Sequence, residues 1–279
     1  MKSITLVSVL SILISTIAAS AFACTIFSAS FDGTFLFGGN EDQSPNCSYL
    51  VTDKTGRLDV IYFATPWKEE PLVMQTGINE AGLCYDANWI PMETLTPHPE
   101  RTAQDEWVIT RLMREVSTVE QVLSRIFNYN WGNAISYQVH FADKTGDAVV
   151  IHPGKDGELT FTRKPRGNGH LVSANFNLAQ FDKSSFSWSR FETANKMLSE
   201  IRSKNDLTVD LMTSVLKATQ RQYGRMKTLY SVVYDLNGMR IYLYYERNFS
   251  QPTVLDVHAH LAKTVGSGKI NLNELLKNP

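Results

Sequence analysis

The chain has 279 residues with 27 basic and 28 acidic side chains, so it carries almost no net charge, and 43% of its residues are hydrophobic. This length allows one large core without requiring a second domain. The balanced charge, with no basic cluster, argues against a nucleic-acid partner. The three cysteines are too few for a disulfide scaffold. No run of about 18 apolar residues follows the N-terminal segment, so a stable membrane span is not expected.

Residues 1–23 have the composition of a secretion signal. Met1-Lys2 provides a short positive start, and an apolar stretch interrupted only by Ser and Thr runs from Ile4 to Ile17. The segment ends in Ala21-Phe22-Ala23, and a small-x-small triplet is typical of a cleavage site. We therefore predict a signal peptide at 1–23, one mature domain at 24–279, and an exported protein, periplasmic or secreted.

Cleavage at this point would make Cys24 the first residue of the mature protein. An N-terminal cysteine combines a thiol nucleophile with its own α-amine as a base, whose reference pKa is about 7.7–8.0. The alternative is a lipoprotein signal, in which Cys24 receives lipid and the chain is a non-enzymatic, lipid-anchored envelope protein. Ala21 and Phe22 fit that signal poorly, since it favours a branched aliphatic residue and then a small one. The two readings exclude each other, because an acylated amine is not a base.

Short β-rich runs separated by turn residues follow Cys24. Asp32-Gly33 is a tight-hairpin signal, and turn residues also occur at 53–56 and 79–82. Helical spacing begins near Trp107, and Ser117-Thr118-Val119-Glu120 is a capping box before a second helix. The predicted strands are 25–31, 34–37, 60–63, 73–78, 83–89, 136–142, 148–152, 159–162, 229–236 and 239–246; the later helices are 188–201 and 209–219. Blocks of antiparallel strands separated by helix pairs indicate a layered α+β domain.

The first hairpin predicts which residues lie near Cys24. Its returning strand ends in Gly38-Gly39-Asn40-Glu41-Asp42, and a regular hairpin returns its far end beside its start. Asn40, Glu41 or Asp42 should therefore lie close to the thiol. A carboxylate there could hold the α-ammonium and share its proton. The alternative is that Asn-Glu-Asp is a solvated turn.

Four segments resemble the choloylglycine hydrolase family of N-terminal-nucleophile amidases, which includes conjugated bile acid hydrolases and penicillin V acylases. The first is Cys24-Thr25, followed after a hairpin by Gly-x-Asn-x-Asp at 38–42. The others are Gly-x-Asn-Glu-x-Gly-Leu at 77–83, Val-Ser-Ala-Asn-Phe at 172–176 and Ser-Arg-Phe at 189–191. The resemblance covers most of the mature chain, and it implies a four-layer αββα sandwich of antiparallel sheets.

The resemblance also implies roles for single residues. Cys24 would be the nucleophile and Asp42 the carboxylate that positions its amine. Asn88 and Asn175 would donate to the oxyanion or order the site, and Arg190 would complete the charge network. No metal or organic cofactor is implied. The match at Asn88 needs a one-residue gap, so Tyr85 and Asp86 remain alternatives there.

The implied activity is hydrolysis of a carbon–nitrogen bond other than a peptide bond, in a linear amide, through an acyl-thioester on Cys24. The partner would be a small-molecule acyl amide: an N-acyl amino acid, a penicillin V-like amide or a bile-salt-like amide. Gly39 departs from the family, whose bile acid and penicillin V members carry Arg there, so the substrate stays open. An acyltransferase using the same thioester is the nearest enzymatic alternative. The sequence also leaves open a homo-oligomer.

Two further features are expected to be structural. His258-Ala259-His260 would place both rings on one face of a strand, but without a third ligand nearby a metal site is not favoured. Cys47 and Cys84 could pair in an oxidising compartment. The alternative is that Cys84 is a small buried hydrophobe.

Overall fold

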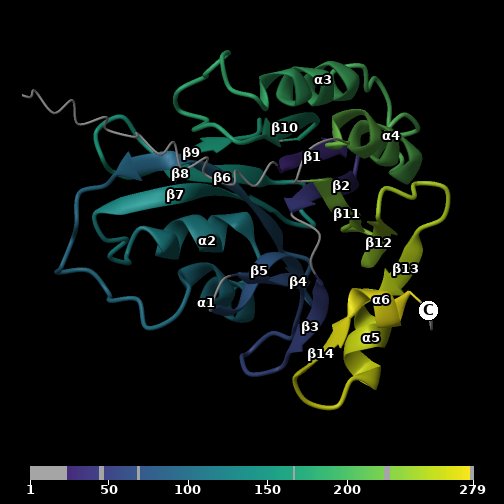
Figure 1. The fold of residues 1–279 in the computed structure, drawn as a ribbon, viewed down its shortest axis with the longest axis horizontal. Coiled ribbons are helices and arrows are strands. Elements are labelled where there is room, and N and C mark those ends of the chain that lie inside the picture. Colours follow the sequence, from purple (N-terminus) through teal and green to yellow (C-terminus); the bar gives the residue numbers. More distant parts are fainter. Residues whose placement is uncertain (1–23, 44–46, 68–69, 166, 223–226, 277–279) are drawn as a thin grey trace, which may run out of the picture.

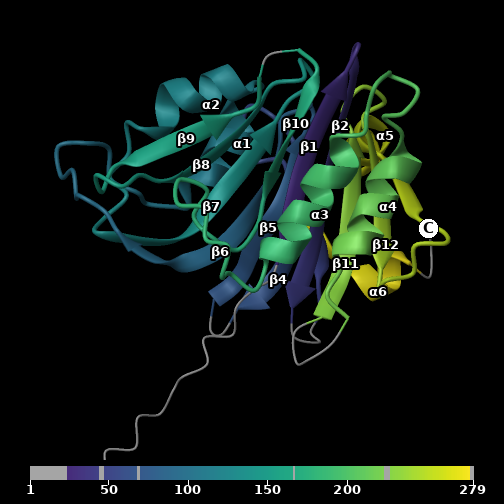
Figure 2. The same cartoon turned by 90° about the horizontal axis from the view of Figure 1, so that it is seen from above.

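The computed structural model describes residues 24–43, 47–67, 70–165, 167–222 and 227–276, whose strands form two antiparallel sheets (Figures 1 and 2). The predicted signal peptide at 1–23 lies outside these residues, so its removal and the domain boundary stay predictions. The first sheet has the order β10 (Gly169–Ser173), β1 (Thr25–Phe31), β2 (Thr34–Gln43), β11 (Lys227–Asp235), β12 (Arg240–Tyr245), β13 (Thr253–Asp256).

The second sheet lies against the first (Figure 2). Its strand order is β14 (Gly268–Asn271), β3 (Tyr49–Asp53), β4 (Val60–Trp67), β5 (Glu70–Asn79), β6 (Cys84–Thr94), β7 (Ala134–Ala142), β8 (Ala148–Pro153), β9 (Leu159–Arg163). Side chains from both sheets form the core between them, with Ile26, Phe37 and Tyr234 from one side and Ile61 and Ile78 from the other.

Helices cover the outer face of each sheet, which completes four layers. Helices α1 (Val108–Glu115) and α2 (Val119–Ile126) pack on the second sheet, while α3 (Trp188–Leu198) and α4 (Val209–Thr219) pack on the first. Short helices α5 (Val257–Lys263) and α6 (Leu272–Leu275) lie near β13 and β14 (Figure 1). The predicted α+β sandwich, with the αββα order, is confirmed.

The β1–β2 hairpin forms as its turn residues predict. Asp32 and Gly33 have positive φ values of 42° and 82°, which a two-residue turn between twisted strands requires. The register pairs Thr25 with Asn40, so the end of β2 lies beside Cys24. β2 runs to Gln43, so the β-rich run expected at 34–37 continues as one strand through the segment 38–42. The sequence from 38 to 43 therefore belongs to a buried strand and not to a solvated turn.

Two sequence-based expectations are wrong in detail. Thr118, not Ser117, caps α2, because its side chain accepts a hydrogen bond from the Gln121 amide. His258 and His260 lie on helix α5 and not on a strand; residues two apart on a helix face different directions, so they do not form the pair expected.

Cys47 and Cys84 are not joined by a disulfide. The Cys84 thiol is buried in the core and donates to the Ala142 carbonyl over 3.4 Å, so it packs as a small hydrophobe. Within the described ranges, no helix is long and apolar enough to cross a membrane.

Candidate active site

Cys24 lies directly before β1, and its side chain is buried. Its Sγ donates a hydrogen bond to Oε2 of Glu41 over 3.4 Å, and the backbone N–H of Asp42 donates to the sulfur. Both partners come from the end of β2, where the hairpin returns. The structure thus places a carboxylate beside the thiol, as the hairpin argument predicts.

Asp42 points away from the sheet interface toward α3. Arg190 of that helix donates to Oδ2 of Asp42 over 2.8 Å and to Oδ1 of Asn175 over 3.3 Å. Thr228 of β11 donates to the other Asp42 oxygen over 2.5 Å. The Asn175 amide in turn donates to the Trp89 carbonyl over 2.9 Å. Asp42, Asn175 and Arg190, which lie far apart in the sequence, therefore form one network.

Asn88 is the β6 residue whose side chain reaches Cys24. Its Nδ2 donates to the backbone carbonyl of Cys24 over 3.1 Å, and the side chain is buried. Tyr85 points to the opposite face of the sheet, where it packs against α1 and donates to the Met74 carbonyl. Of the three alternatives for this position, Asn88 alone brings an amide donor to Cys24.

Burial sets the protonation of these groups. Desolvation raises the pKa of the Cys24 thiol well above its usual value, and the charge of Glu41 adds to the effect. Desolvation also raises the pKa of Asp42 to about 6, although Arg190 and Thr228 oppose the shift. The Arg190 guanidinium has a lowered pKa because it too is buried, with Asp42 acting in the opposite direction.

The sequence does not predict that the carboxyl groups of Glu41 and Asp86 form a pair. Asp86 of β6 is fully buried and is hydrogen bonded to Glu41. A Cβ atom added at Gly39 would lie 2.1 Å from Oδ2 of Asp86, so any larger residue at position 39 would collide with this carboxyl group. The alternation Cys84, Asp86, Asn88 along a strand was the available signal, because residues two apart share a face.

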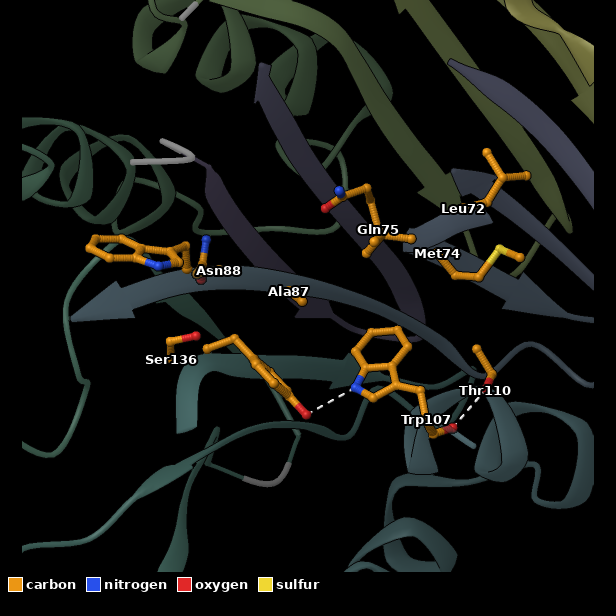
Figure 3. A pocket seen from close by; sticks show the side chains of 11 residues that line it. Leu72, Met74, Gln75, Ala87, Asn88, Trp107, Thr110 and Ser136 are labelled. Atoms are coloured by element: carbon orange, nitrogen blue, oxygen red, sulfur yellow. Dashed lines mark hydrogen bonds between the residues drawn. The ribbon is translucent and has the colours of Figure 1, made fainter. Parts of the chain in front are cut away.

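An apolar pocket of about 570 Å³ opens next to Asn88 (Figure 3). Strands β5 and β6 pair only from Thr76–Asp86 to Ile78–Cys84, whereas β6 pairs with β7 from Cys84–Ala142 to Thr94–Ala134. The pocket occupies the place where the two strands separate. Its lining includes Leu72, Met74, Ala87, Asn88, Trp89, Trp107 and Tyr137. Figure 3 shows Ala87 and Asn88 on one strand, with Leu72, Met74 and Gln75 across from them.

No group of three or more His, Cys, Asp or Glu side chains suited to a metal ion occurs in the part of the chain that the structure describes.

Comparison with known proteins identifies the family. A family model described as acyl-coenzyme A:6-aminopenicillanic acid acyl-transferase matches residues 29–249. The chain belongs to this family. The match includes Asp42, Asn88, Asn175 and Arg190, and it begins just after Cys24. No similar sequence was found among curated proteins.

Solved structures share the fold of this acyl-transferase family member. A cysteine-to-alanine mutant of conjugated bile acid hydrolase from Clostridium perfringens aligns with a TM-score of 0.67 and 15% identity, covering 88% of this chain and 96% of that one. Penicillin V acylase from Agrobacterium tumefaciens aligns with a TM-score of 0.65 and 14% identity, covering 89% and 91%. These matches confirm the resemblance to amidases of the choloylglycine hydrolase type; the roles of single site residues stay predictions.

Proposed function

We propose that this protein is an exported N-terminal-nucleophile amidase, in which removal of residues 1–23 frees the α-amine of Cys24. The observation that supports this most directly is the convergence on Cys24 of groups from separate parts of the fold. Glu41 and Asp42 come from β2 and Asn88 from β6, while Arg190 comes from α3 and joins through Asp42. A buried cysteine that served only as a lipid attachment point would not need these partners.

The proposed reaction is acyl transfer through a thioester. The Cys24 sulfur attacks the carbonyl carbon of a linear amide, and the Asn88 and Asn175 amides donate to the oxyanion or order the site around it. A donor of this kind typically contributes about 10²–10³ in rate. The leaving amine takes a proton from the α-ammonium as the C–N bond breaks, and water then hydrolyses the thioester.

The pocket between β5 and β6 suggests the acyl group. Asn88 both contacts Cys24 and lines the pocket, so an acyl group on the sulfur could enter it directly. Aromatic and aliphatic side chains dominate the lining, and the volume lies within the range usual for small-molecule sites. We therefore propose substrates with an apolar acyl group, such as N-acyl amino acids or aryl-substituted acyl amides.

Acyl transfer to an amine is a second candidate, because the matching family is described as an acyl-transferase. The two activities share the thioester and differ in whether water or an amine attacks it. They are separated by the product formed when a free amine is present.

The first experiment defines the N-terminus of the exported protein by intact mass and N-terminal sequencing. Processing between Ala23 and Cys24, with a free amine, is the expected result. A diacylglyceryl mass increment on Cys24 would instead establish the lipid-anchored alternative and end the enzymatic proposal.

The second experiment tests turnover on a panel of acyl amides, scored by amine release. The panel pairs acetyl with octanoyl and phenoxyacetyl amides and includes a glycine-conjugated bile salt. Hydrolysis should favour the larger apolar acyl groups, and Cys24→Ala should lower it at least 10³-fold. Cys84→Ala removes another buried thiol and should retain activity. Unchanged turnover in Cys24→Ala would disprove the catalytic role, and a new amide formed with an added amino acid would favour acyl transfer.

A further inference from the structure

The buried carboxyl groups of Glu41 and Asp86 lie at the interface between the two sheets, next to the thiol. Along β2, Gly39 and Glu41 share a face that is directed toward the second sheet, while Asn40 and Asp42 face the helices. The absence of a side chain at Gly39 leaves the space that Asp86 occupies. Gly39, Glu41 and Asp86 are therefore parts of one arrangement.

The two carboxyl groups of Glu41 and Asp86 must hold at least one proton between them. Neither Oε1 of Glu41 nor Oδ2 of Asp86 accepts a hydrogen bond from an amide or hydroxyl donor among the described residues. Two ionised carboxylates in contact at a buried position repel each other strongly, whereas one shared proton satisfies both and leaves a single charge. Asp86 is the member that holds the proton: burial and Glu41 raise its pKa well above the usual value.

We propose that Glu41, held by protonated Asp86, is the direct proton acceptor of the Cys24 thiol. This proposal rests on the proposed function. In that function the α-amine alone accepts the thiol proton, whereas here the Glu41–Asp86 pair accepts it. Glu41 contacts the reacting sulfur through the 3.4 Å hydrogen bond, and position 39, a glycine whose side-chain space Asp86 fills, supplies no guanidinium to stabilise a thiolate.

Proton transfer within the site conserves atoms and charge. The S–H bond of Cys24 breaks, its electron pair stays on sulfur, and the proton forms an O–H bond on Glu41. The pair then holds two protons and no charge, so the negative charge has moved to the attacking sulfur. The α-ammonium protonates the leaving amine, and Glu41 returns its proton to the α-amine, which restores the pair.

Several titratable groups lie near Glu41. Cys24, Asp86, Tyr230 and Tyr234 share the interface between the sheets with it, whereas Tyr85 and Asp42, with Arg190 acting through Asp42, lie on the outer faces. Desolvation, the largest influence, raises the pKa of Glu41 to about 7, and the hydrogen bond from Asp86 opposes that rise. Glu41 therefore becomes protonated as the pH falls through about 7, and thiol reactivity should fall with it.

The test measures iodoacetamide alkylation of Cys24 by peptide mass mapping, from pH 5 to 9, on the chain that begins at Cys24. The protein without substitutions should show a reactivity midpoint near pH 7. Glu41→Gln should lower the rate at pH 7.5 at least tenfold and remove that midpoint. Asp86→Asn still donates to Glu41 but carries no titrating proton, so its midpoint should stay near pH 7, and loss of the midpoint in this folded variant would assign the titration to Asp86 and overturn the proposal.

Tyr230→Phe is the matched control, since Tyr230 pairs with Glu41 in the sheet register and is equally buried. It should leave the midpoint in place, and thermal melting verifies that each variant is folded. An unchanged profile in folded Glu41→Gln would overturn the proposal. Alkylation does not depend on amide turnover, so failure of the amidase proposal would appear separately, as normal thiol titration without hydrolysis.

Discussion

At the residue scale, the site is a set of buried polar groups whose partners come from distant parts of the chain. In the Gly-x-Asn-x-Asp segment, Asn40, Glu41 and Asp42 each contact a different part of the fold. Asn40 donates to the Leu216 carbonyl of α4 and accepts from Ser231, which ties the strand to its neighbours. Asp42 binds Arg190, and Glu41 binds the thiol. Among the residues that the structure describes, Glu41 is the one whose side chain accepts a hydrogen bond from the sulfur, so we infer that Asp42 and Arg190 are positioning residues.

The two hydrogen bonds that the Arg190 guanidinium donates lead to a prediction at the residue scale. A lysine at position 190 keeps the charge but cannot donate to both Asp42 and Asn175 in the planar geometry of a guanidinium. We expect Arg190→Lys to lower kcat at least tenfold, with a smaller change in KM, while the protein stays folded. Steady-state kinetics on the best acyl amide measures this. Arg202→Lys, at an exposed position, is the control. Equal kcat values for the two variants would contradict a positioning role for Arg190.

At the element scale, periodicity and turn residues predict most strands and helices, because these signals are local. The turn signal at Asp32-Gly33 is enough to place the segment Asn40-Glu41-Asp42 near Cys24, although it does not single out Glu41. The separation of β5 from β6 is not predictable from the sequence, since both chains continue as strands beyond Thr76–Asp86 and distant packing decides where their pairing ends. The close approach of Asp86 to Gly39 is not predictable either, because the two residues lie on different sheets and no local sequence pattern indicates which parts of the two sheets are in contact.

The segment 77–83 resembles the family, yet none of its side chains is hydrogen bonded to the thiol. Asn79 gives this segment a structural role instead. Its Nδ2 donates to the carbonyls of Met113 and Val116 at the end of α1, and its Oδ1 accepts from the amides of Ala81 and Leu83. One buried side chain therefore closes the β5–β6 turn and fastens it to the helix.

We expect Asn79→Ala to lower the free energy of unfolding by roughly 2–4 kcal/mol, because buried backbone groups would lose their partners. Urea denaturation followed by circular dichroism measures this. Glu80→Gln, in the same turn, should change stability by less than about 0.5 kcal/mol, since an amide oxygen can still accept from the Asp59 backbone. A small, equal effect of both substitutions would refute the structural role of Asn79.

At the scale of the whole molecule, polar bridges hold the two sheets in register across an otherwise apolar interface. His140 of β7 is fully buried, with Nε2 2.9 Å from the Ser28 hydroxyl and Nδ1 3.2 Å from the Ser173 hydroxyl, both on the first sheet. Phe37 packs edge-on against the imidazole at 5.2 Å. The ring is buried and its two hydrogen-bond partners are hydroxyls, not carboxylates, so the fold favours the neutral imidazole, and the stability of the sandwich should depend on pH.

The sign of that dependence follows from the pKa. Burial lowers the pKa of His140 from 6.5 to about 3, so between these values the unfolded chain binds a proton that the folded protein does not. The contribution of His140 to stability is therefore complete above pH 6.5 and is lost as the pH falls toward 3. At pH 4.5 the loss should be roughly 2–3 kcal/mol. The pKa values of Glu41 and Asp42 are raised, which is the opposite direction. The measured dependence of stability on pH therefore combines these effects, and comparison with a variant is needed to isolate the contribution of His140.

His140→Gln makes that comparison, because glutamine can still hydrogen bond to Ser28 and Ser173 but does not titrate. The substitution removes the ring contact with Phe37, and this loss is the same at every pH. We therefore expect the stability gap between the two proteins, measured by urea denaturation, to be largest at pH 7.5 and to shrink by roughly 2–3 kcal/mol at pH 4.5. A gap that stays constant over this range would show that His140 is accessible to protons in the folded state, and that the interface between the sheets is not as tightly sealed as the contacts indicate.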